Sequence, residues 1–280
     1  MDFIYAVVLG IVEGGTEFLP ISSTGHLLVA SAFLSFPTAA LVVPDPKAFR
    51  DTFSIFIQIG AVAAVFAFYG RDLAAQARRI GQDRAVQRFW LGIALAFLPA
   101  ALVGFLLRNV IKAVFFTPWV VGVALLIGGA IFLLIERHPR AAQVTALEGI
   151  GLRAALLIGV AQMTALIPGV SRSGASIVGG LLLGLDRRTA TAFSFYLALP
   201  TLGTATLFDL LLALREEAVA GAHLPLFGVG ALVSFVVAWL SIAWLLRYVS
   251  RHTFRPFGYY RMAAGAAIIA LVLFTDLLAG

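Results

Sequence analysis

Six long apolar runs constrain the fold of this chain more than any other feature of its sequence. Each approaches or exceeds the ~20 residues that a helix needs to cross a bilayer; they cover residues 51–69, 89–107, 113–135, 189–214, 224–246 and 262–279. With 61% hydrophobic and only 12% charged residues, the composition excludes an ordinary soluble domain. The sequence therefore predicts an all-α polytopic membrane protein that forms one integral membrane domain over residues 1–280.

Two further apolar regions are each interrupted by a polar break. Residues 2–12 and 27–36 flank the first break, and residues 149–185 contain the second, at 168–176. The apolar stretches on either side are too short to span a bilayer. Each region therefore predicts a re-entrant hairpin, a helix–break–helix unit that dips into the membrane and returns to the side from which it entered.

The two interrupted regions resemble each other when they are aligned so that residue 10 matches residue 159. The alignment pairs small, polar and hydroxyl residues: Gly10 with Gly159, Glu13 with Gln162, and Ser22 with Ser171. Because the hairpins enter from opposite sides, the repeat would be inverted, with residues 1–148 and 149–280 as its halves. Inverted repeats with broken helices place a polar site near the bilayer midplane. We therefore expect the two breaks to share one site.

Basic residues are distributed unevenly between the connecting segments. With residues 71–88 in the cytoplasm and six spans alternating, fourteen Lys and Arg residues fall on the cytoplasmic side and five on the other, as the positive-inside rule favours. Both termini then lie outside, and the net charge of +6 is not a sign of nucleic-acid binding. In this scheme residues 247–261 form a basic cytoplasmic segment whose aromatic residues mark the membrane interface.

Arg172 is the most unusual residue of the second break because it lies between two apolar runs. An arginine at membrane depth costs roughly 2.5–3.5 kcal/mol on insertion scales, so it is a functional candidate by default. Pro168 and Gly169 end one helix, and Ser171 or Ser173 can cap the next. A helix N-terminus, hydroxyls and a guanidinium together suit a phosphate. The alternative is a Pro-Gly kink with an arginine that snorkels to the interface.

The first break carries two carboxylates. Glu13 and Glu17 are four residues apart and so share one face of a helix, where they repel each other unless a cation or a proton accompanies them. Arg172 is one candidate partner, and a divalent metal bound through oxygen is another. The alternative is a pair of solvated residues at a helix end.

A histidine and two serines follow the carboxylates. His26 lies one turn into the helix that Ser22 or Ser23 could cap. A histidine at this place is a candidate acid, base or phosphoryl nucleophile, or a core histidine bonded to a carbonyl. The serines are candidate phosphate ligands or simple helix caps.

Both breaks carry long motifs that resemble one known family, the undecaprenyl-diphosphate phosphatases of the bacitracin-resistance type. The resemblance rests on Glu13-Gly14-x-Thr16-Glu17-Phe18-Leu19-Pro20-x-Ser22-Ser23-Thr24-Gly25-His26 and Pro168-Gly169-x-Ser171-Arg172-Ser173-Gly174-Ala175. It extends to Gln58-Ile59-Gly60-Ala61, Phe193-Ser194-Phe195 and Tyr260-Arg261. It implies a bacterial inner-membrane hydrolase that removes the terminal phosphate of the C55 lipid diphosphate, which recycles the carrier for peptidoglycan synthesis and confers bacitracin resistance.

The resemblance also assigns roles by position. Glu13 and Glu17 match the family's acidic pair, which would hold a divalent metal, Mg²⁺ or Ca²⁺, and His26 matches its histidine. The phosphate-binding residues would be Ser22, Ser171, Arg172, Ser173 and Ser176, the last in place of the family's usual threonine. The site would face the periplasm. We expect Ser23 or water to attack in line, His26 to handle the proton, and Arg172 to stabilise the phosphoryl charge.

Two other classes of function fit some of these features. Inverted repeats with broken helices are typical of secondary transporters, so the chain could instead be a lipid-phosphate flippase or an ion-coupled carrier. A membrane scaffold would leave the buried charges unexplained. The sequence leaves a homodimer open.

Overall fold

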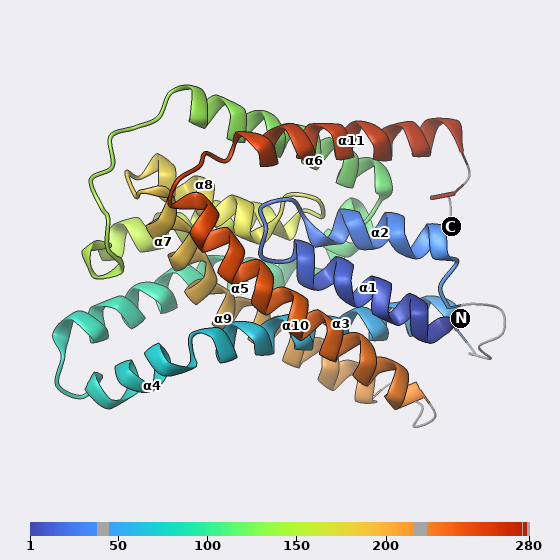
Figure 1. Ribbon diagram of the computed structural model, residues 1–280, viewed down its shortest axis with the longest axis horizontal. Coiled ribbons are helices and arrows are strands. Elements are labelled where there is room, and N and C mark those ends of the chain that lie inside the picture. The colour runs from blue at the N-terminus through green and yellow to red at the C-terminus, as the bar shows by residue number, and fades with distance from the viewer. Residues whose placement is uncertain (38–44, 216–222, 276, 279–280) are drawn as a thin grey trace.

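The computed structural model describes residues 1–37, 45–215, 223–275 and 277–278, and every regular element in that part of the chain is a helix (Figure 1). The α-helices are α1 (Asp2–Thr16), α2 (Ser23–Leu34), α3 (Pro46–Phe68), α4 (Gly70–Arg79), α5 (Arg84–Phe115), α6 (Pro118–Arg137), α7 (Leu152–Met163), α8 (Arg172–Leu182), α9 (Arg187–Arg215), α10 (Leu224–Val249) and α11 (Arg255–Phe274). Two short 3₁₀ helices are η1 (Leu147–Gly149) and η2 (Thr164–Leu166).

Six of the described helices are long and apolar enough to cross a membrane: α3, α5, α6, α9, α10 and α11. This confirms the predicted all-α membrane architecture with six spans. Consecutive spans run in opposite directions, and the connections containing α4 and η1 lie at the end of the molecule opposite the N-terminus (Figure 1). The orientation of these ends in a bilayer stays a prediction.

Several predicted span boundaries are wrong, and the two largest differences are at the end of α5 and the start of α11. The second span was expected to end at residue 107, but α5 continues to Phe115. Arg108 lies inside this helix, where it donates a 2.7 Å hydrogen bond to Asp209 on α9. The last span was expected to begin at residue 262, but α11 begins at Arg255, with a proline in its first turn. A fixed φ suits that position, so the basic segment becomes part of the helix.

Two pairs of short helices correspond to the predicted hairpins. In each pair, α1–α2 and α7–α8, the second helix returns alongside the first. The first break covers residues 17–22 and the second covers residues 167–171, after η2. Both breaks lie in the middle of the molecule (Figure 1). The re-entrant placement of the pairs in a membrane stays a prediction.

Each short pair packs on a long helix from the other half of the chain. A Cβ added at Gly10 of α1 would lie 2.6 Å from the carbonyl oxygen of Gly230 on α10, and one added at Gly159 of α7 would lie 2.2 Å from that of Ala96 on α5. Small residues allow this close approach of helix backbones. The aligned glycines thus make matching contacts across the halves, which supports the inverted repeat as a hypothesis.

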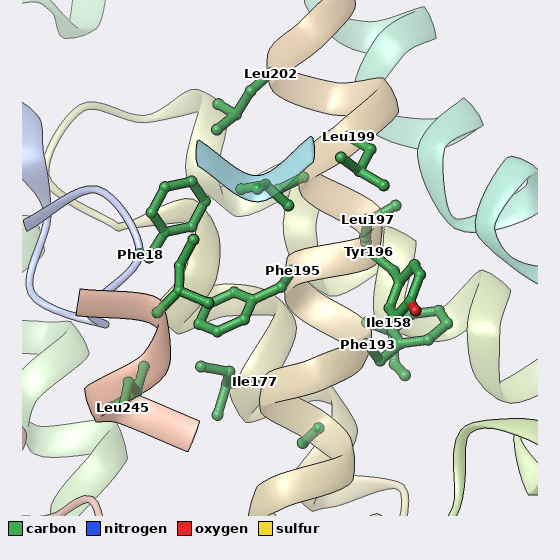
Figure 2. Packing of buried hydrophobic residues seen from close by; sticks show 14 of the residues in the cluster. Phe18, Ile158, Ile177, Phe193, Phe195, Tyr196, Leu197, Leu199, Leu202 and Leu245 are labelled. Atoms are coloured by element: carbon green, nitrogen blue, oxygen red, sulfur yellow. The ribbon is translucent and has the colours of Figure 1, made fainter. Parts of the chain in front are cut away.

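Helix α9 passes through the centre of the largest hydrophobic cluster (Figure 2). Its residues 193 and 195–199 are all buried, and a helix that is apolar on every side belongs inside a protein. Phe195 meets Phe18 of the first break edge to face, with ring centroids 5.5 Å apart. This contact joins the core directly to the first break.

Candidate active site

The two breaks share an uncommon backbone conformation at the residue that precedes the returning helix. Ser22 has φ 71° and ψ 100°, and Ser171 has φ 70° and ψ 117°. Positive φ is rare outside glycine and is concentrated at functional sites. The side chain of Ser171 caps α8 by accepting a hydrogen bond from the N–H of Gly174 at 3.1 Å. The expectation that Ser22 or Ser23 caps α2 is wrong, because no side-chain cap bond forms there.

Direct contacts join the breaks. Nε of Arg172 lies 3.7 Å from Oε1 of Glu17, and the hydroxyl of Ser173 donates to the carbonyl oxygen of Leu19 at 3.0 Å. The hydroxyl of Ser23 donates to Oε2 of Glu17 at 2.5 Å. The structure therefore brings an arginine from one half and a serine–carboxylate pair from the other into one site, as the repeat predicts.

A cavity of about 170 Å³ lies between the breaks. It is lined by Glu17, Ser22, Ser23, Thr24, Gln58, Ala165, Ile167, Pro168, Gly169, Ser171, Arg172 and Leu202. A larger cavity of about 350 Å³ lies at the ends of α6 and α8. There Glu136 and Arg187 satisfy each other through two hydrogen bonds, of 2.8 and 2.6 Å. The smaller cavity is the better candidate site because it holds hydrogen-bonding groups that remain to be paired.

Arg172 supplies these unpaired groups. Its side chain is only 9% exposed, and one terminal nitrogen donates to the carbonyl oxygen of Ser194 at 3.1 Å. The other terminal nitrogen and Nε are buried without a hydrogen-bond partner, because the 3.7 Å separation from Glu17 is too long for a hydrogen bond. Unpaired buried donors are costly, so the arrangement suits an anion with two oxygens to accept them.

The carboxylates fit a divalent metal only together with further oxygens. Glu13 is 2% exposed and Glu17 is 8% exposed, and the part of the chain that the structure describes holds no cluster of three or more acidic, histidine or cysteine residues that could bind a metal. Mg²⁺ is commonly held by one or two carboxylates and completed by substrate phosphate and water. This pair next to a phosphate-sized cavity is compatible with such a site.

Not every candidate residue lines the cavity. Ser173 and Ser176 are at most 1% exposed, and Ser176 donates to the carbonyl oxygen of Arg172 and to the hydroxyl of Ser194. Both serines thus support the turn around Arg172. Glu13 also lies outside the cavity lining, one helical turn before Glu17. Phosphate and metal binding by these three residues stays a prediction.

His26 is held beside the cavity by two partners. Its Nδ1 lies 2.7 Å from the carbonyl oxygen of Ser22, so Nδ1–H donates and Nε2 accepts from the hydroxyl of Tyr260 at 2.6 Å. The two rings are stacked, with centroids 5.5 Å apart. Its catalytic role stays a prediction. In this arrangement Ser23 is bonded to Glu17 rather than to His26.

Residue-level reasoning missed two neighbours on α11 and one on α3. Tyr260 and Arg261 were assigned to a cytoplasmic interface segment, but Tyr260 contacts His26 and Arg261 is 0% exposed against both breaks. The segment assignment is therefore wrong for Arg261, because α11 begins two turns earlier than expected. Gln58 lines the cavity and accepts a hydrogen bond from Thr206 at 2.9 Å. Its polar side chain inside an apolar run was the available signal.

Comparison with known proteins gives a consistent result. The chain is 47% identical over 273 residues to an undecaprenyl-diphosphatase of Deinococcus radiodurans, covering 97% of this chain and 96% of the relative. It is 45% identical over 266 residues to an undecaprenyl-diphosphatase of Acidovorax ebreus, covering 94% and 93%. The family model described as bacitracin resistance protein BacA matches residues 6–267. The chain belongs to the BacA bacitracin resistance family, as its motifs predict.

Proposed function

We propose that this protein is an undecaprenyl-diphosphatase, which hydrolyses undecaprenyl diphosphate to undecaprenyl phosphate and inorganic phosphate. Relatives with this name match nearly the whole chain. The reaction recycles the lipid carrier for peptidoglycan synthesis and, by consuming the diphosphate, confers bacitracin resistance. The observation that carries the proposal is Arg172, which lines the cavity beside the Ser23–Glu17 pair and has two buried donors without a hydrogen-bond partner.

Arg172 is suited to bind the terminal phosphate. Two parallel N–H donors match two phosphate oxygens, and the fixed charge stabilises the negative charge that spreads over the phosphoryl group during transfer. The bond between Arg172 and the Ser194 carbonyl fixes the guanidinium in advance, so little reorganisation is needed. Helix α8 begins at Arg172, so the positive end of its dipole also lies at this place.

Ser23 is suited to be the nucleophile. Its hydroxyl already donates to Glu17 at 2.5 Å, so Glu17 can accept the proton as the Ser23 oxygen attacks the terminal phosphorus. The bond from phosphorus to the bridging oxygen breaks, and undecaprenyl phosphate leaves. Water then hydrolyses the phosphoserine to free serine and inorganic phosphate.

A divalent metal, Mg²⁺ or Ca²⁺, would be held by Glu13 and Glu17 together with substrate oxygens. When bound, it would neutralise charge on the diphosphate. We propose that His26 exchanges a proton with water or the leaving group once its Nε2 is released from Tyr260.

We also propose that the protein lies in the bacterial inner membrane with this site facing the periplasm. Six apolar helices support a multi-pass membrane protein. Basic residues are in excess in the connections at the end of the molecule where α4 lies. This excess supports a cytoplasmic position for that end.

The nucleophile is tested with Ser23→Ala and with Ser31→Ala as the matched control. Ser31 lies in the same helix, where its hydroxyl donates back to the carbonyl oxygens of Leu27 and Leu28. We expect Ser23→Ala to abolish phosphate release and Ser31→Ala to retain it. Acid quenching of wild type with substrate labelled in the terminal phosphate should trap labelled protein, and Ser23→Ala should trap none. Full activity of Ser23→Ala would exclude Ser23 as the nucleophile.

A further inference from the structure

Arg261 makes contacts that no catalytic step described above requires. It is 0% exposed, and its two terminal nitrogens donate to four backbone carbonyls. One donates to Pro20 at 3.1 Å, and the other to Ala124 at 3.3 Å, Gly169 at 3.0 Å and Val170 at 3.1 Å. Pro20 belongs to the first break, and Gly169 and Val170 belong to the second. One side chain therefore binds both breaks and α6.

The chemistry of these contacts requires a guanidinium. A helix break leaves carbonyls without their intrahelical donors, and each must be satisfied in an environment that excludes water. Among the described residues no carboxylate forms an ion pair with Arg261, so its charge is met by carbonyl dipoles alone. A planar fork can reach carbonyls in different directions, whereas the single nitrogen of a lysine cannot reach the same set.

Helix α6 leaves a slot for this side chain. A Cβ added at Gly128 would lie 2.1 Å from a terminal nitrogen of Arg261 and 2.7 Å from its Cζ. On the other side, a Cβ added at Gly174, in the first turn of α8, would lie 3.4 Å from the other terminal nitrogen. The guanidinium is thus confined between α6 and the helix that begins at Arg172.

We propose that Arg261 is a positioning residue that clamps the two breaks together and thereby places Arg172 of one break against Glu17 of the other. Tyr260, the preceding residue, holds His26, so one turn of α11 fixes groups from both halves of the site. The expected effect on catalysis rests on the proposed hydrolase function. The clamp itself is a structural feature that does not depend on that function.

Two variants disturb the clamp in different ways. Arg261→Met removes every donor at similar length, and Gly128→Ala leaves the arginine in the chain but fills its slot. We expect each to lower kcat/KM for phosphate release from C55 isoprenyl diphosphate, by roughly 100-fold for Arg261→Met, since a misplacement of about 1 Å can cost that much. Arg261→Lys should recover only part of the loss.

Matched controls separate the clamp from general damage to α11 and α6. Arg255 lies in the same helix and also donates to one backbone carbonyl, that of Glu136 at 3.0 Å, but it contacts neither break. Arg255→Met should keep wild-type kcat/KM. A Cβ added at Gly203 meets nothing within 4 Å, so Gly203→Ala controls for a glycine change inside a membrane-spanning helix.

A distance measurement tests the clamp without relying on activity. The chain contains no cysteine, so Thr24→Cys and Thr164→Cys give one pair of spin labels on exposed positions beside the two breaks. We expect a single narrow distance distribution in the otherwise unchanged protein and with Arg255→Met, and a broader or shifted one with Arg261→Met and Gly128→Ala.

The outcomes are distinguishable. An unchanged distance distribution in folded, monodisperse Arg261→Met or Gly128→Ala would overturn the clamp, whether or not activity falls. If Arg261→Met fails to fold, Gly128→Ala decides in the same way. If the wild-type protein releases no phosphate, the hydrolase proposal fails, while the distance measurement still tests the clamp.

Discussion

Replacing Arg172 by lysine tests whether the guanidinium fork, rather than its charge alone, binds the phosphate. Lysine keeps the positive charge near Glu17 but offers one nitrogen, so it loses the second of the two donors that are unpaired in the structure. A hydrogen bond to a charged group contributes about 1.5–3 kcal/mol. At about 1.4 kcal/mol per factor of ten, Arg172→Lys should lower kcat/KM roughly 10- to 150-fold.

The assay is steady-state release of inorganic phosphate from C55 isoprenyl diphosphate by detergent-purified protein. Arg108→Lys is the matched control, because Arg108, like Arg172, lies close to a carboxylate, here Asp209, but away from the breaks. The thermal unfolding of both variants should show that they remain folded. Equal kcat/KM for Arg172→Lys and wild type would refute the idea that two arginine donors bind the phosphate.

Three further changes have defined outcomes. Glu13→Gln should raise the Mg²⁺ concentration needed for half-maximal phosphate release, and an unchanged metal titration would remove Glu13 from the metal site. Glu136→Gln should lower the free energy of unfolding by about 3 kcal/mol, because it breaks the buried pair with Arg187. This value is at the low end for such a pair, since Arg187 is 34% exposed. An unchanged thermal unfolding curve in detergent would contradict this. Gly60→Ala should destabilise the protein by about 1–3 kcal/mol, because the added Cβ would lie 2.0 Å from a carbonyl oxygen on α10. Equal melting temperatures of Gly60→Ala and the control Gly203→Ala would contradict this, since they would show that the two helices move apart without cost.

The membrane spans could be predicted because hydropathy over about 20 residues is a local property of the sequence. The residues at which the spans begin and end could not be predicted in the same way. In the sequence Arg108 looks like the end of a span, but in the structure it pairs with Asp209, 101 positions further along the chain. Arg255 and Pro256 look like loop residues, yet they begin α11. A charged residue such as Arg108 can therefore lie inside a helix when a distant residue pairs with it.

The centre of the site could also be predicted, because its residues lie in two unusual local motifs. The matching positive φ values of Ser22 and Ser171 agree with the alignment of the two breaks. The supporting residues could not be found from residue properties alone. Arg261 resembles an ordinary interface arginine, and its four carbonyl partners come from three distant segments.

The most direct test of the account is phosphate release from C55 isoprenyl diphosphate by purified wild-type protein, measured with Mg²⁺, with Ca²⁺ and with chelator, beside Arg172→Ala. We expect phosphate release that depends on a divalent metal and is lost in Arg172→Ala. Absence of release from well-folded wild type with either metal, together with movement of the lipid across liposome membranes, would contradict it and favour a carrier.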